Sequence, residues 1–188
     1  MSEESQAGFW SSEDSADLYR IDAWGQGYFG VSPDGRLQIR PGGDDAEIID
    51  LLEVVEGLGE RDLSPPLLIR FSDILAHRLG TLRGAFAGAI AENGYRGRYV
   101  AAYPVKVNRQ RPVVEEVFRY GTEYDFGLEV GSKPELLAVR ALTGGASERL
   151  HVCNGFQDDG YIEAAILAAK LGRRIGPIVE DPGELGLI

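Results

Sequence analysis

From Leu67 onward, short apolar runs alternate with longer segments whose apolar residues recur at helical spacing. The runs that we expect to be strands are 67–71, 99–107, 126–130, 150–153 and 174–179. The helices expected between them cover about 72–93, 112–120, 133–142 and 159–169. Strands and helices that alternate through short loops form a parallel sheet with right-handed crossovers. We therefore predict an α/β fold for this larger part of the chain.

Two α/β folds fit this pattern, an open doubly wound sheet and a (β/α)8 barrel. A dinucleotide-binding sheet has no local support, because no Gly-x-Gly-x-x-Gly follows the first strand. Polar residues instead stand at the carboxyl ends of the expected strands: Lys106, Asn108, Glu129, Asn154 and Glu180. A barrel builds its active site at that face and needs roughly 250 residues, about twice the strand–helix units present here. We expect the N-terminal portion of a barrel, and thus a fragment of a longer protein.

Three regions are expected along the chain. Residues 1–18 are acidic and Ser-rich and are predicted to be a flexible tail. Residues 19–66 should hold a β-hairpin over Gly27 to Arg40, turning at Ser32-Pro33-Asp34-Gly35, and a helix from about Ala46 to Gly57 capped by Asp44 or Asp45. Residues 67–188 are then the first half of the barrel.

Composition excludes several functional classes. The net charge is −11 and there is no basic run, which disfavours nucleic acid and anionic membranes as partners. Cys153 is the only cysteine, so no disulfide can form within the chain. Neither a secretion signal nor an apolar run of roughly 18 residues is visible. A cytoplasmic protein is the expectation.

Lys106 is the strongest candidate for chemistry. It lies between Val105 and Val107 near the end of an apolar run, where a buried ammonium would need a partner or would have to be neutral. Desolvation lowers the pKa of a lysine, and a neutral amine can condense with an aldehyde to give a Schiff base. The alternative is a structural lysine whose stem packs while its ammonium reaches water.

The residues around Lys106 resemble a known motif. Tyr103-Pro104-Val105-Lys106-Val107-Asn108 resembles the pyridoxal-phosphate lysine motif of the barrel-type decarboxylases of basic amino acids, whose barrel is of the alanine-racemase and ornithine-decarboxylase type. With its continuation to Glu115, it resembles the biosynthetic arginine decarboxylase family. Further stretches resembling that family in the same order are 24–29, 70–75, 127–136 and 152–156. From about Phe9 to Glu180, the chain resembles the N-terminal portion of that family.

The resemblance implies a function. It implies that Lys106 holds pyridoxal 5′-phosphate as a Schiff base, and that L-arginine is decarboxylated to agmatine and carbon dioxide, the first step of a polyamine route to putrescine and spermidine. It also implies magnesium, although the sequence shows no cluster of ligands for it, and a homo-oligomer for the full-length protein. The later strands, the glycine-rich phosphate loop and the acidic partner of the pyridine nitrogen would lie after Ile188.

Two further residues are candidates for binding the cofactor. Glu129 could hydrogen-bond the lysine or the cofactor, or it could be a surface carboxylate near a helix N-terminus. Asn154 could join the site, or Asn154-Gly155 could be an ordinary turn. Ser132 and Glu135 fit a capping box.

Other functions stay open. A related barrel with the same lysine motif could be a racemase or a non-catalytic pyridoxal-phosphate carrier, and a diaminopimelate or ornithine decarboxylase would share the fold. As an isolated half-barrel with an unpaired edge strand, the 188-residue fragment would be inactive whatever its parent does.

Overall fold

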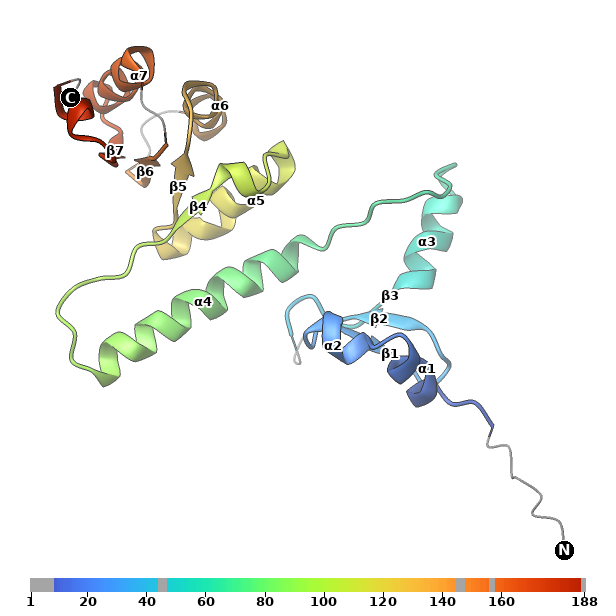
Figure 1. Cartoon of the computed structure of the whole chain (residues 1–188). Helices are drawn as coiled ribbons and strands as arrows, with labels where there is room; N and C mark the ends of the chain where they lie inside the picture. The colour runs from blue at the N-terminus through green and yellow to red at the C-terminus, as the bar shows by residue number, and fades with distance from the viewer. Residues whose placement is uncertain (1–8, 44–46, 145–147, 156–157, 187–188) are drawn as a thin grey trace, which may run out of the picture. The chain divides into compact units, whose positions relative to one another are not determined.

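The computed structural model describes residues 9–43, 47–144, 148–155 and 158–186. The chain forms two compact units, Met1–His77 and Arg78–Ile188, and the division between them falls inside helix α4 (Ser72–Glu92; Figure 1). Among the described residues, no helix is both long enough and apolar enough to cross a membrane.

The first unit contains a small antiparallel sheet. Its strands β1 (Phe29–Val31) and β2 (Leu37–Ile39) form the predicted hairpin, and the Gly35 amide closes the turn on the Ser32 carbonyl at 2.9 Å. A third strand, β3 (Ile49–Asp50), pairs with β2 and was not expected. Ile39 is fully buried in this unit. The hairpin prediction is confirmed.

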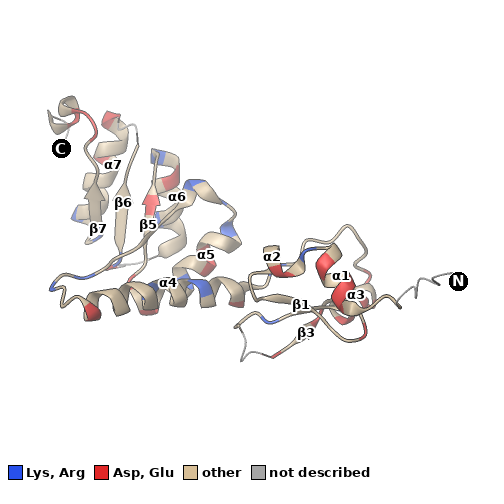
Figure 2. Cartoon of the chain, turned by 60° about the horizontal axis from the view of Figure 1, so that its bottom comes forward, with Lys and Arg blue, Asp and Glu red and all other residues tan. Residues whose placement is uncertain are grey.

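Helices in the first unit differ from the sequence prediction. Helix α1 (Ser12–Leu18) lies inside the predicted flexible tail, since Ser11 and Asp14 form a capping box at its start. A short helix α2 (Ile21–Gly25) follows it. Helix α3 (Leu51–Gly59) begins five residues later than predicted, because Asp50 caps it by accepting from the Leu52 amide at 2.8 Å. Residues 44–46, the predicted caps and helix start, lie outside the described residues. Acidic residues, which colour the ribbon red in Figure 2, recur on α1 and α3.

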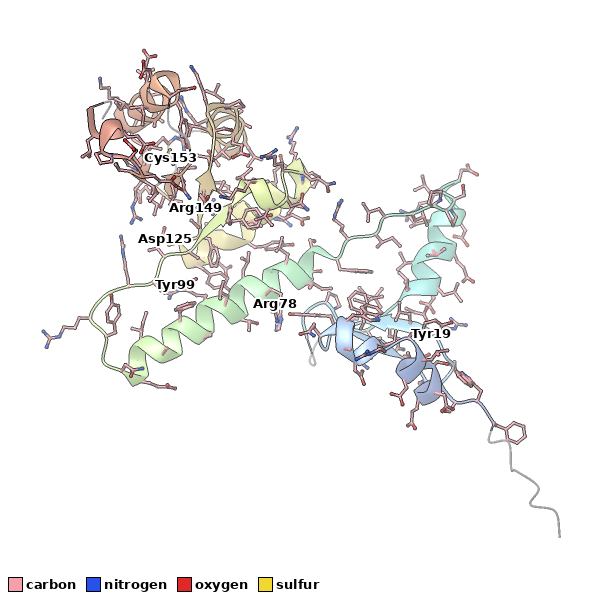
Figure 3. All side chains as sticks on the ribbon, in the orientation of Figure 1. Tyr19, Arg78, Tyr99, Asp125, Arg149 and Cys153 are labelled. Carbon is pink, nitrogen blue, oxygen red and sulfur yellow. The ribbon has the colours of Figure 1, made fainter. Side chains whose placement is uncertain are left out.

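The prediction of a first barrel strand over residues 67–71 is wrong. Residues 67–71 have no regular secondary structure, since no described strand hydrogen-bonds to them. The long helix predicted after them is confirmed as α4, where Phe86 stacks on Tyr99 with ring centroids 3.8 Å apart (Figure 3).

The second unit contains the predicted parallel sheet. Its strands are β4 (Ala102–Pro104), β5 (Gly127–Val130), β6 (Leu150–Cys153) and β7 (Arg174–Pro177), and each pairs in parallel with the next along the chain. The connecting helices are α5 (Arg111–Tyr120), α6 (Lys133–Thr143) and α7 (Asp159–Lys170). Single-turn 3-10 helices cover Val105–Val107 (η1), Gly121–Tyr124 (η2) and Pro182–Gly186 (η3). The α/β prediction is confirmed.

The two faces of this sheet differ in burial. Leu128, Val130 and Cys153, which share one face by alternation and register, are at most 1% exposed. Tyr161 of α7 packs on that face and donates to the Val130 carbonyl at 2.7 Å. Glu129 and Val152 point to the opposite face and are only partly buried. The helices therefore cover one face, and the candidate carboxylate lies on the other.

The predicted strand 99–107 is much shorter than expected. Pro104 has no amide hydrogen to continue the ladder, and the chain turns into η1 immediately after it. Lys106 therefore lies on a single helical turn beyond the strand, and the expected alternation of side chains does not extend to it.

Candidate active site

The structure brings together the three residues that the sequence singled out. Lys106 Nζ lies 3.1 Å from Glu129 Oε1. The Asn154 side-chain amide donates to the same Glu129 oxygen at 3.3 Å. The three residues come from three neighbouring strand ends, so the Glu129 carboxylate is the centre of a polar cluster at the carboxyl end of the sheet.

Strand register explains this meeting. Pro104 of β4 is paired with Glu129 of β5, and the chain continues from Pro104 directly into the turn that carries Lys106. Val105 is 5% exposed and anchors that turn in the core. On the other side of β5, the backbone amide of Asn154 donates to the Val130 carbonyl at 3.0 Å. This hydrogen bond continues the ladder one residue beyond β6. The pairing of the backbone therefore sets the spacing of the cluster.

The environment of Lys106 differs from the prediction. The expected burial between two valines is wrong, because Val107 is 71% exposed and the Lys106 side chain is 56% exposed. The cause is the helical turn, which points Val105 inward and the next two residues outward. The Glu129 side chain, at 17% exposed, is the more buried partner of the pair. The ammonium is thus reachable from outside while it is held by a semi-buried carboxylate.

Asn154 has hydrogen-bonding capacity left over. Its Oδ1 atom is buried and has no hydrogen-bond partner among the described residues. Gly155 follows with φ +113°, and a Cβ there would lie 2.9 Å from the Gly131 carbonyl oxygen, so this turn requires glycine. Asn154 thus contacts Glu129 while Gly155 turns the chain, and binding of the cofactor by Asn154 stays a prediction.

The opposite, helix-covered face of the sheet carries buried groups behind Glu129, among them Tyr161 and Cys153. Burial raises the pKa of the Tyr161 hydroxyl and the pKa of the Cys153 thiol. Both groups are therefore uncharged at neutral pH, and Cys153 is the small buried residue that the sequence suggested. These groups therefore add no charge to the helix-covered face behind Glu129.

Sequence reasoning missed one connection at this site. Ser132 caps α6 as predicted, but Glu135 does not bond back to the Ser132 amide. Glu135 instead accepts from the Gly131 amide at 2.7 Å and from Arg109 Nε at 2.8 Å. Arg109 follows the lysine motif directly, but no local pattern pairs it with a residue 26 positions away.

The other two strand-end residues, Asn108 and Glu180, form hydrogen bonds within their own loops. Asn108 Oδ1 accepts from the Gln110 amide at 3.0 Å, before α5 begins. The amide of Glu180 donates to Glu184 at 2.9 Å. Neither is linked to the cluster by a described side-chain contact.

The residues present fit the aldehyde end of pyridoxal phosphate. An exposed primary amine is required for condensation with an aldehyde, and Lys106 supplies it. The unpartnered Asn154 Oδ1 can accept a hydrogen bond from a donor on a ligand. No group of three His, Cys, Asp or Glu able to hold a metal occurs within the described residues. A cavity of about 380 Å³ between α5 and α6 includes none of the three cluster residues.

Comparisons with known proteins agree with the motifs. No family model matches the chain. A biosynthetic arginine decarboxylase of Prochlorococcus marinus (strain MIT 9303) is 48% identical over 176 residues, which is 94% of this chain and 27% of that protein. One from Phocaeicola vulgatus is 46% identical over 179 residues, 95% of this chain and 28% of the relative.

A solved structure is also similar. The crystal structure of the biosynthetic arginine decarboxylase from Campylobacter jejuni matches with a TM-score of 0.80 and 32% identity, over 90% of this chain and 28% of that one. The resemblance stated from the motifs is therefore confirmed. The chain spans about a quarter of the length of the curated relatives that it matches.

Proposed function

We propose that this chain, a homologue of the biosynthetic arginine decarboxylases over 94% of its length, carries the cofactor lysine of a pyridoxal-phosphate-dependent arginine decarboxylase. The reaction would convert L-arginine to agmatine and carbon dioxide, as the first step of a polyamine route. The observation that carries the proposal is the placement of Lys106 Nζ 3.1 Å from Glu129, at the carboxyl ends of parallel strands. Parallel α/β barrels build their active sites at that end.

The cofactor, when bound, supplies the electron sink for loss of the α-carboxylate. Lys106 would provide the amine that holds the cofactor through its aldehyde carbon. Glu129 accepts a hydrogen bond from the Lys106 ammonium at 3.1 Å and holds it at the carboxyl end of the sheet. Asn154 donates to Glu129 Oε1 and so fixes the carboxylate toward Lys106. Glu129 and Asn154 thus orient the side-chain nitrogen of Lys106.

The (β/α)8 barrel is part of the same proposal. Four consecutive strands lie side by side in chain order without a reversal, as they do in a barrel. The face that carries Glu129 and Val152 is only partly buried, as expected for an inner face that later strands would close over. A homo-oligomeric full-length protein and a magnesium requirement are proposed on the resemblance alone, and a cytoplasmic location is proposed on the composition of the sequence.

The test is carbon dioxide release by the full-length protein that contains this chain. We expect release from arginine and much less from ornithine, lysine or diaminopimelate. Lys106→Ala should lower the rate by about 10²-fold or more. Lys133→Ala is the matched control, because Lys133 is an exposed lysine at the start of α6. Preference for another amino acid, racemisation without carbon dioxide release, or full activity of Lys106→Ala would overturn the proposal.

A further inference from the structure

We propose that Glu135 is a positioning residue that holds the Lys106 turn against Glu129, an inference that rests on the proposed function. Glu135 lies in the first turn of α6 and is 8% exposed. Each of its carboxylate oxygens has a different partner, and the two partners belong to different loops. A buried carboxylate with two directional partners fixes the distance between them.

The first partner is attached to the lysine turn. Glu135 Oε1 accepts from Arg109 Nε at 2.8 Å, and Arg109 is three residues after Lys106. The Arg109 side chain is 69% exposed, so this ion pair adds little to stability. Its geometric effect is separate from its energy, because it ties the loop after β4 to the start of α6.

The second partner is attached to the strand of Glu129. Glu135 Oε2 accepts from the Gly131 amide at 2.7 Å, two residues after Glu129. A capping-box glutamate would accept from the amide of the cap, Ser132. Glu135 reaches one residue further back, so helix capping alone does not account for its geometry.

The loop that follows β6 and carries Asn154 also contacts Gly131. The Gly155 α-carbon packs so closely on Gly131 that a Cβ on Gly155 would lie 2.9 Å from its carbonyl oxygen. The loops of Lys106, Glu129 and Asn154 therefore meet at one residue, Gly131, and Glu135 is the side chain that links the lysine loop to it. Loss of this link should let the lysine turn shift relative to Glu129.

The experiment compares Glu135→Gln, Arg109→Ala and the double variant in the full-length protein. Glutamine keeps the shape, but its amide nitrogen must face either Arg109 or the Gly131 amide, both donors. Arg111→Ala is the matched control, because it removes a similar ion pair, Arg111–Glu115 at 2.6 Å, on the exposed surface of α5. Each protein is assayed without cofactor and with added pyridoxal phosphate, and its thermal melting is recorded.

Two readouts report on positioning. In cofactor-free protein, acetic anhydride should modify Lys106 at least about threefold faster relative to Lys133 and Lys170 in Glu135→Gln, because Glu129 no longer holds the ammonium. With cofactor and arginine, kcat should fall about 10-fold or more with a smaller change in KM, since displacement by about 1 Å can cost 10²-fold. The double variant should resemble Glu135→Gln alone.

The outcomes separate this inference from the proposed function. If Glu135→Gln shows the same relative acetylation of Lys106 and the same kcat as Arg111→Ala, the inference is wrong. If pyridoxal phosphate never attaches to Lys106 in the unsubstituted protein, the proposed function is wrong, and the acetylation ratio still decides whether Glu135 positions the lysine.

Discussion

His151 makes the stability of this fold depend on pH. It shares the helix-covered face of the sheet with Leu128 and Cys153, and it is 2% exposed. Neither ring nitrogen has a hydrogen-bond partner within the described part of the chain. Burial, and then the positive charges of Arg173 and Arg149, lower the pKa of His151 from 6.5 to about 4 (Figure 3 labels Arg149, at the start of β6).

The sign of the effect follows from proton binding. Between pH 6.5 and pH 4 the unfolded chain protonates His151 and the folded chain does not, so unfolding takes up a proton. Above pH 6.5 the imidazole of His151 is neutral in both states and does not lower the free energy of unfolding. As the pH is lowered toward 4, the free energy of unfolding falls. A pKa difference of this size corresponds to about 1–3 kcal/mol at pH 4.

The perturbation that tests this is His151→Leu, which keeps an apolar side chain of similar size and removes the titrating group. The melting temperature should be measured from pH 7.5 to pH 4 for the parent protein, His151→Leu and His77→Gln. His77 is the only other histidine of the chain, and its Nδ1 lies 2.6 Å from the Tyr28 hydroxyl. As the pH falls, the melting temperature of His151→Leu should rise relative to that of the unsubstituted protein. The difference between His77→Gln and the unsubstituted protein should stay constant.

If His151→Leu and the parent lose the same stability between pH 7 and pH 4, the imidazole of His151 is not kept neutral by the fold, and the reasoning from burial and the two arginines fails.

Three further substitutions test the site and its support. Tyr161→Phe should lower the free energy of unfolding, measured with denaturant, by about 1–3 kcal/mol, because it leaves the buried Val130 carbonyl without its hydroxyl donor. An unchanged free energy of unfolding would show that water replaces the hydroxyl. Asp158→Ala should cost about 1 kcal/mol in the same assay, because it removes the cap that accepts from the Tyr161 amide at 2.7 Å, and Asp159→Ala is its control. Glu129→Gln should lower decarboxylation about 10²-fold without lowering the melting temperature, since it removes the charge facing Lys106, and unchanged kinetics would exclude Glu129 from the chemistry.

Local signals in the sequence predicted much of this fold. The cap Ser132 was predicted correctly because capping depends on residues within one turn. The strand 150–153 was predicted at its observed bounds, since its apolar run is bounded by polar residues and a glycine turn. The meeting of Lys106, Glu129 and Asn154 could be expected because the carboxyl ends of parallel strands lie together.

Features that depend on distant partners could not be predicted in the same way. Residues 67–71 have the composition of a strand, but a strand also requires a neighbour to hydrogen-bond with, which periodicity does not reveal. In the run 99–107 the ladder ends at Pro104, a local signal that the prediction of a strand as far as Val107 did not use. The bond between Arg109 and Glu135 spans 26 positions and has no local signature.

The central claim is that Lys106 is the cofactor lysine, and one labelling measurement tests it most directly. The full-length protein is incubated with pyridoxal phosphate, reduced with borohydride and digested, and the modified peptide is identified by mass. The chain has three lysines, Lys106, Lys133 and Lys170, so its own peptides are easily told apart. We predict the label on Lys106. Label on another lysine, or no label at all, would contradict the claim and leave Lys106 as an exposed lysine paired with Glu129.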